Sequence, residues 1–179
     1  LKSFFSSLIT IEEEKKGPVL DETIKRVKER KEEDPVFKWI ERLHAAYPGD
    51  IGVLSPLFLN LVCLEPGEAM HISPGELHAY LEGAGLEIMA NSDNVIRGGL
   101  TPKHIDSEEL ISVLHFSSGE PDILEPREES KGELFYPKIS DEFMLSRIHS
   151  DEKGEPYKSP GKRSAEILIC VDGEAVMTE

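Results

Sequence analysis

Leu57 to Lys103 is the stretch that decides the fold, and it reads LFLNLVCLEPGEAMHISPGELHAYLEGAGLEIMANSDNVIRGGLTPK. It opens with an apolar run, residues 57–64, of the length of a β-strand. The segment 65–68, Glu-Pro-Gly-Glu, is a turn signal. Short apolar segments then alternate with Pro and Gly breaks, which is typical of successive β-hairpins. The stretch therefore predicts antiparallel β-structure.

A spacing of glycine and histidine inside this stretch indicates a metal site. Small metal-binding β-barrels of the cupin type carry a motif G-x5-P-x-G-x2-H. Gly67, Gly75 and His78 fit this motif, although Ser73 replaces its proline and Pro74 comes one place later. A Gly-assisted turn presents the next strand so that its histidine points into the barrel, where neutral imidazole can ligate a metal. The alternative is a hairpin with a buried or surface histidine that binds nothing.

The segment that starts at His78 carries a more specific resemblance. It reads HAYL at 78–81 and EIMANSDNVIRGGLTPK at 87–103. These motifs resemble the signature of type I mannose-6-phosphate isomerases, which are zinc enzymes built from cupin barrels. They interconvert mannose 6-phosphate and fructose 6-phosphate. The resemblance implies a zinc-dependent aldose–ketose isomerase, with one Zn²⁺ per intact site and a sugar phosphate as substrate.

The resemblance implies roles at the metal and in the chemistry. The histidine of the HAYL motif is a zinc ligand in the family, which implies this role for His78. The family's catalytic arginine matches Arg97, whose guanidinium could stabilise an enediolate or polarise a carbonyl. Asp93 could orient Arg97 or take part in proton transfer. Alternatively, Arg97 and Asp93 form a buried ion pair, or Asp93 is only a turn residue.

The same resemblance implies that Lys103, Tyr80 and Glu87 bind the substrate. Lys103 is expected to hold an oxygen of the phosphate or of the sugar, and the alternative is a surface lysine. Glu87 can also be structural. His71 lies seven residues before His78, but the family does not use that position as a ligand.

The family's other three zinc ligands have no counterpart in this sequence. They are a Gln and a His in a Q-x-H motif and a Glu further on, and they precede the helical region in the family. A catalytic zinc needs about three protein ligands. We therefore expect the chain to be the C-terminal part of such an enzyme, and the isolated 179-residue chain to be inactive. Gly98 stands where the family often has Ala.

Residues 1–50 are predicted to be a helical region of three short helices. Apolar residues recur at helical spacing before Gly17-Pro18, which is expected to end the first helix. The second is expected at 21–33 with Asp21 as N-cap, and the third after the Asp34-Pro35 start signal. The basic run 25–31 alternates with Glu and indicates a solvated helix face.

The rest of the chain is predicted to be mainly β. Ser107 is expected to cap a short helix that ends near residue 114, and residues 117–131 read as a linker or long loop. Strands are expected at 134–136, 143–148 and 165–171, and Asp172-Gly173 is a hairpin signal. The expected fold class is mainly β with a helical segment, containing partial cupin-type jelly-roll elements. Residues 51–120 would form the second half of the catalytic barrel, and 121–179 a C-terminal cupin-like segment that is truncated.

Composition limits the classes of partner. The formal charge of −15 disfavours nucleic acid but leaves a small anionic substrate open, because a few local cations can hold one phosphate. Two cysteines make no disulfide scaffold, so a reducing, cytoplasmic compartment fits. The sequence contains no signal peptide and no apolar run of membrane-spanning length. We expect a cytoplasmic monomer that binds no membrane.

Two other functions remain open at this point. One is a non-catalytic sugar-phosphate-binding or regulatory cupin that has lost its metal. The other is a different cupin enzyme, such as an epimerase or oxygenase, against which the segment SDNVIRGGLTPK argues.

Overall fold

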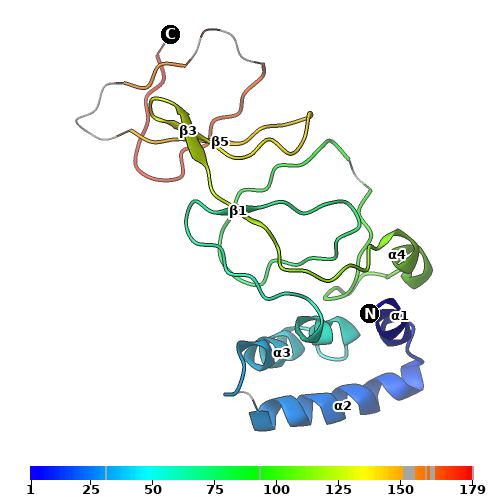
Figure 1. Ribbon diagram of the computed structural model, residues 1–179. Coiled ribbons are helices and arrows are strands. Elements are labelled where there is room, and N and C mark those ends of the chain that lie inside the picture. Colours follow the sequence, from blue (N-terminus) through cyan, green and yellow to red (C-terminus); the bar gives the residue numbers. More distant parts are fainter. Residues whose placement is uncertain (31, 93, 151–155, 160, 162–163, 179) are drawn as a thin grey trace.

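The computed structural model describes residues 1–30, 32–92, 94–150, 156–159, 161 and 164–178. In Figure 1 the first three helices gather at the end that holds the N-terminus, and the C-terminal residues lie at the opposite end. The elements in chain order are α1 (Lys2–Ile9), α2 (Glu13–Arg30), α3 (Pro35–Ala46), the 3₁₀-helix η1 (Ile51–Leu57), β1 (Ala69–Met70), α4 (Ser107–Val113), β2 (Ile123–Leu124), β3 (Arg127–Ser130), β4 (Glu133–Phe135) and β5 (Ser146–Ile148).

Three helices, α1 to α3, lie within residues 1–50, and α2 and α3 together with η1 hold the main hydrophobic core. One apolar face each of α2, α3 and η1 packs together. Ile40 and Val53 are completely buried. The core residues are Leu20, Ile24, Val27, Ile40, Leu43, Ile51, Val53 and Leu54. Their spacing along α2 and α3 is that of one helix face, which is why the helical pattern was visible in the sequence.

The start of α2 differs from the prediction, because the helix runs through Gly17-Pro18. The carbonyl of Glu12 accepts hydrogen bonds from the backbone N–H groups of Lys15 and Lys16, at 2.9 and 3.1 Å. The helix is thus established before Pro18, which lacks an N–H and gives up only the bond to the carbonyl four residues earlier. Asp21 is therefore an interior residue and not an N-cap.

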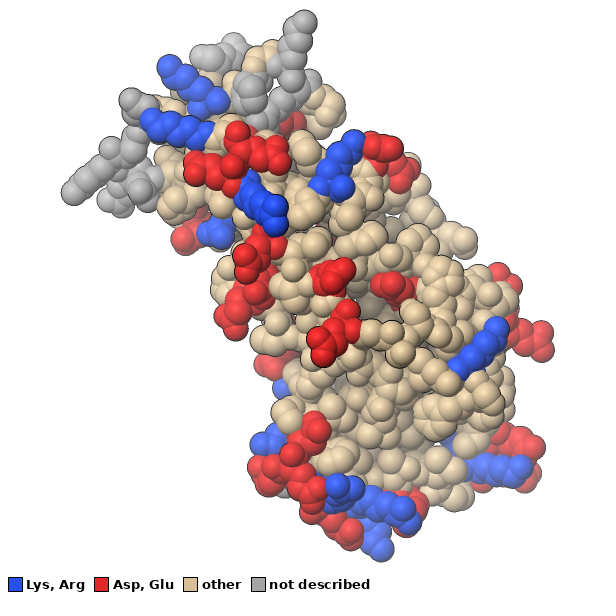
Figure 2. All heavy atoms as spheres, viewed as in Figure 1, with Lys and Arg blue, Asp and Glu red and all other residues tan. Residues whose placement is uncertain are grey.

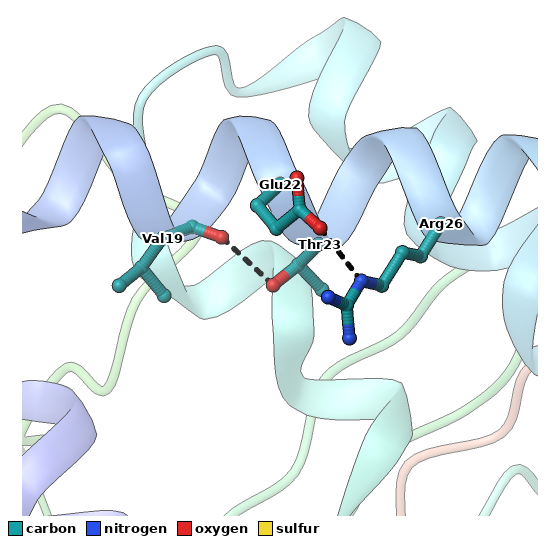
Figure 3. A network of polar contacts seen from close by, with 4 residues as sticks. All are labelled: Val19, Glu22, Thr23 and Arg26. Carbon is teal, nitrogen blue, oxygen red and sulfur yellow. Dashed lines mark hydrogen bonds and ion pairs between the residues drawn. The ribbon is translucent and has the colours of Figure 1, made fainter.

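Two other local predictions for the helices are confirmed. Asp34 is the N-cap of α3, and its Oδ1 accepts from the backbone N–H of Val36 at 2.8 Å. The basic run in α2 lies on a solvated face, where Arg26 pairs with Glu22 at 2.8 Å (Figure 3). The Thr23 hydroxyl in the same view donates to a backbone carbonyl of the preceding turn.

The β-structure consists of short antiparallel strands. β1 pairs with β2, and β3, β4 and β5 form a three-stranded sheet in that order. The strands expected at 134–136 and 143–148 are confirmed in part by β4 and β5. The predicted loop 117–131 instead contains β2 and β3, because β1 and β4 supply their backbone hydrogen bonds. The helix α4 is capped by Asp106, whose Oδ1 accepts from the N–H of Glu109 at 3.0 Å, and not by Ser107.

Two predicted strands are wrong for the described residues. Residues 57–64 begin in η1 and then run without strand pairing, and 165–171 also form no strand. A strand is stable only when a neighbouring backbone pairs with it, and no described segment does so here. Ile167 is 90% exposed. The described chain is therefore a mixed fold with few short strands, rather than a mainly β one.

Long-range hydrogen bonds connect these parts. The Tyr136 hydroxyl donates to the carbonyl of Gly67 at 2.7 Å, and the Asn60 amide donates to the carbonyl of Gly119 at 2.7 Å. The fully buried Glu133 accepts from the Ser146 hydroxyl at 2.7 Å. Among the described helices, none is long and apolar enough to cross a membrane.

Candidate active site

Glycines with positive φ shape the approach to His78. Gly67 has φ +98° and Gly75 has φ +83°, a backbone conformation that favours glycine. A Cβ on Gly75 would lie 2.7 Å from the carbonyl oxygen of Val113. The carbonyl of Gly75 in turn accepts from the N–H of His115 at 2.9 Å. The predicted turns are thus confirmed, and the second one is tied to the end of α4. The strand expected after it is wrong, because residues 76–80 form no strand and His78 is exposed rather than directed into a barrel.

A backbone hydrogen bond fixes the His78 ring in a state that suits a metal ligand. Nδ1 of His78 lies 2.9 Å from the carbonyl oxygen of Glu76. A carbonyl only accepts hydrogen bonds, so Nδ1 carries the proton and neutral His78 keeps a free lone pair on Nε2. Metal-binding histidines commonly donate the other ring N–H in this way. His78 is exposed, so Nε2 can meet a ligand from outside the described residues.

The described residues supply only part of a metal site. No group of three or more His, Cys, Asp or Glu side chains in the described part of the chain could hold a metal ion. Zinc sites take about three or four protein ligands. His78 therefore fits as one donor, and the described residues do not complete the set.

Tyr80 lies beside His78, and Glu87 lies beside Tyr80. The Tyr80 ring meets the His78 ring edge to face, with 6.1 Å between the centroids. Partial desolvation raises the pKa of Tyr80, and a hydrogen bond to Glu87 and the negative charge of Glu87 raise it further. Tyr80 thus remains protonated at neutral pH. The structure brings these three predicted site residues together.

Arg97 forms no buried ion pair in the described part of the chain. The Arg97 side chain is exposed, which disagrees with the alternative of a buried ion pair. Asp93, its predicted partner, lies outside the described residues. Gly98, after Arg97, packs closely on Leu77: a Cβ there would lie 2.5 Å from the Leu77 Cδ1 atom. An alanine at 98 thus requires the Leu77 side chain to shift.

Lys103 faces a different hollow from His78. His78 lines a small one of about 50 Å³, together with Gly98 and Gly99. Lys103 lines one of about 510 Å³ between the helical region and residues 101–107. Lys16 and His104 also line that larger hollow, together with the carboxylates of Glu13 and Asp50.

Sequence reasoning missed Asp50, which lines the larger hollow. Its Oδ1 accepts from the N–H of Gly52 at 2.7 Å, and its Oδ2 accepts from the N–H of Thr101 at 3.1 Å. An Asp before an apolar helical run is an N-cap signal, so the first bond could have been expected. The second joins residues 51 positions apart, and no local pattern indicates it.

The face shown in Figure 2 is uneven in charge. Lys, Arg, Asp and Glu gather at its two ends, and the middle is mostly uncharged with a few acidic side chains. The middle corresponds to the segments around β1 in Figure 1. An uncharged face suits contact with other protein segments better than contact with nucleic acid.

Comparison with known proteins identifies the family. Residues 1–59 match the family described as the phosphomannose isomerase type I helical insertion domain. The chain is 42% identical to mannose-6-phosphate isomerase of Salmonella typhimurium over 180 residues, covering 99% of this chain and 44% of that protein. It is 37% identical to a probable mannose-6-phosphate isomerase of Caenorhabditis elegans over 179 residues, covering 99% of this chain and 43% of that protein.

Solved structures agree with the sequence relatives. The crystal structure of the Salmonella typhimurium enzyme bound to substrate and a zinc atom has a TM-score of 0.72 and 39% sequence identity. The match covers 81% of this chain and 37% of that one. The helical region and the fold of this chain are thus similar to those of phosphomannose isomerases. The chain belongs to the type I phosphomannose isomerase family, and it spans less than half the length of the curated relatives it matches.

Proposed function

We propose that this chain forms part of a zinc-dependent mannose-6-phosphate isomerase, which converts mannose 6-phosphate to fructose 6-phosphate. The observation that carries the proposal is the His78 ring, whose Nδ1–H is held by the Glu76 carbonyl at 2.9 Å while Tyr80 lies beside it and Glu87 lies beside Tyr80. The relative of known structure, which binds zinc and substrate, supports the same assignment.

The chemistry requires a proton shift between adjacent carbons and stabilisation of an enediolate. A bound zinc ion supplies polarisation of the sugar oxygens. His78 would hold it through Nε2, and the other ligands would come from outside the described residues. The Glu76 carbonyl keeps the His78 ring oriented, as outer-shell partners of metal ligands commonly do.

The other site residues act on charge and orientation. Arg97 would stabilise negative charge that develops on the sugar oxygens, because its guanidinium is permanently charged. Asp93 would orient Arg97. Tyr80, protonated at neutral pH, would donate a hydrogen bond to the substrate, and Glu87 would hold its hydroxyl. Lys103 would bind a phosphate oxygen from the neighbouring hollow.

The arrangement of the longer protein follows from the same proposal. Residues 1–50 are the helical region, 51–120 the second half of the catalytic cupin barrel and 121–179 a C-terminal cupin-like segment. The three-stranded sheet β3–β5, which lies wholly within residues 121–179, supports a separate C-terminal segment. The β1–β2 pair joins residues on both sides of position 120. Cys63 and Cys170 are both free and exposed, which suits a reducing cytoplasm.

The test is an assay of the full-length protein that carries this chain. Conversion of mannose 6-phosphate should stop on chelation and return with zinc. Arg97→Ala should lower kcat by about 10²–10³-fold, the range found when a donor to a developing oxyanion is removed. Arg26→Ala is the matched control, because Arg26 is an exposed arginine of α2 that pairs only locally with Glu22.

Two results would contradict the proposal. One is a folded, zinc-loaded protein that does not turn over mannose 6-phosphate, which would favour the non-catalytic sugar-phosphate-binding function. The other is a kcat of Arg97→Ala equal to that of Arg26→Ala, which would leave Arg97 without a role in the reaction.

A further inference from the structure

We propose that Asp50 is a positioning residue that holds Lys103 ready for the substrate phosphate. Through Asp50 the helical region would set the affinity for substrate. This inference rests on the proposed function and adds to it a residue outside the motif that resembles the family signature.

The Asp50 carboxylate accepts two backbone hydrogen bonds from two different segments. Oδ1 accepts from the N–H of Gly52, at 2.7 Å, and so caps η1. Oδ2 accepts from the N–H of Thr101, at 3.1 Å. Both hydrogen bonds are charge-assisted and therefore stronger than neutral ones. Asp50 is half-buried, so water competes less for its oxygens than at the surface.

The Asp50 carboxylate also holds a strained segment of backbone. Gly99 has φ +136° and Leu100 has φ +53°, and a left-handed conformation is unfavourable for a residue with a side chain. Gly52 and Gly99 also touch: a Cβ on Gly99 would lie 2.9 Å from the Cα atom of Gly52. The Asp50–Thr101 hydrogen bond follows directly after Leu100 and offsets part of the strain there.

A further hydrogen bond connects Thr101 to Lys103. The Thr101 hydroxyl oxygen accepts from the backbone N–H of Lys103 at 3.2 Å. Two consecutive hydrogen bonds thus run from the Asp50 carboxylate through Thr101 to the backbone of Lys103. Asp50, Thr101 and Lys103 line the same hollow of about 510 Å³.

Basic side chains in this hollow can contact a phosphate group. Lys16 and His104 line it beside Lys103, and Glu13 and Asp50 are the carboxylates that line it. Both Asp50 oxygens are occupied by backbone N–H groups, and Glu13 lies 3.7 Å from the Lys16 ammonium. The Lys103 ammonium makes no ion pair with any described residue, so it is available to an anion.

One substitution separates helix capping from positioning. Asparagine caps helices about as well as aspartate, so Asp50→Asn keeps an oxygen for the Gly52 N–H. Its second group is an NH₂, which cannot accept from the Thr101 N–H. The control is Asp34→Asn, since the Asp34 side chain caps α3 in the same way and makes no other hydrogen bond within the described residues.

The experiment measures kcat and KM for mannose 6-phosphate in the full-length, zinc-loaded protein. Asp50→Asn should raise KM about tenfold, the equivalent of one lost charge-assisted hydrogen bond, with a smaller change in kcat. Asp34→Asn should leave both constants near those of the unsubstituted protein. In a Lys103→Ala background the KM effect of Asp50→Asn should vanish, because a positioning residue needs the residue it positions.

A second variant keeps the test decisive if Asp50→Asn does not fold. Thr101→Val removes the hydroxyl oxygen that accepts from Lys103 but keeps the N–H that Asp50 binds, and it should also raise KM only when Lys103 is present. Equal kinetic constants for Asp50→Asn and Asp34→Asn, or KM effects undiminished in the Lys103→Ala background, would overturn the inference. An unsubstituted protein without isomerase activity would instead reject the proposed function itself.

Discussion

Gly99 lies at the point where the segment that carries Arg97 crosses the helical region. A Cβ on this residue would lie 2.9 Å from the Cα atom of Gly52, and φ is +136°. Backbone cannot move aside as a flexible side chain can, and an L-residue is strained at this φ. Gly99→Ala is therefore expected to lower the free energy of unfolding by about 1–3 kcal/mol.

Urea unfolding followed by circular dichroism measures this loss, with Gly119→Ala as the control. Gly119 has open space around the Cβ position and no positive φ, so its substitution should change the stability by about 0.5 kcal/mol or less. Equal midpoints for the two variants would show that Gly52 and Gly99 are not in close contact in solution.

The same residues show which parts of the site the sequence could predict. The positive φ values of Gly67 and Gly75 follow from a local glycine–histidine spacing, so the turns before His78 were predictable. The tautomer of His78 was not, because it depends on which carbonyl meets Nδ1. Asp50 was not predictable either, since its bond to Thr101 spans 51 positions and nothing near Asp50 encodes it.

At the scale of elements, one ion pair joins α3 to the loop after the HAYL motif. The guanidinium of Arg42 lies over the Trp39 ring at 4.1 Å from its centroid, and its Nη1 bonds the Glu82 carboxylate at 2.9 Å. The hydrogen bond and the charge of Arg42 lower the pKa of Glu82 below its ordinary value of 4.5. The pair therefore holds this loop to the helical region only while Glu82 is ionised.

The sign of the pH dependence follows from this shift. The pKa of Glu82 is lower in the folded protein than in the unfolded chain. The pair therefore stabilises the fold at pH values above the pKa of Glu82 in the unfolded chain. This stabilisation is lost as the pH falls through the pKa of Glu82 in the folded protein. NMR titration of the Glu82 carboxyl should show its pKa rising toward the ordinary value in Arg42→Met. High salt should raise it in the unsubstituted protein, because the pair is exposed. An identical Glu82 pKa in both proteins would exclude the pair.

A helix could be predicted from the sequence where its apolar face and its N-cap are both local patterns. The core face of α3 and its Asp34 cap are local patterns. The run of α2 through Pro18 is not, because it depends on a helical turn that has already formed from Glu12 onward. The apolar segments 57–64 and 165–171 have strand composition, but a strand also needs a partner, and composition does not supply one.

At the scale of the whole molecule, order is concentrated at the helical end. Ile40 and Val53 are completely buried there, whereas Ile167 and Val176 are each 90% exposed near the other end of the chain. Segments with few buried contacts and unpaired backbone open most easily. In the proposed longer protein, further β-structure would cover this apolar segment, because exposed runs of this kind are otherwise prone to pair with other chains.

Limited proteolysis of the 179-residue chain tests this distribution of order. A protease of broad specificity should first cut within residues 164–178, and a fragment that retains residues 1–57 should persist, because cleavage needs an exposed and locally unpaired backbone. Mass spectrometry of the early products locates the cuts. In the full-length protein the same segment should be cut more slowly, since its apolar side chains would then be packed. First cuts in α2 or α3 would contradict the expected concentration of order in the helices. Equal cleavage rates in the two proteins would show that the apolar residues of 165–171 are not packed against further β-structure.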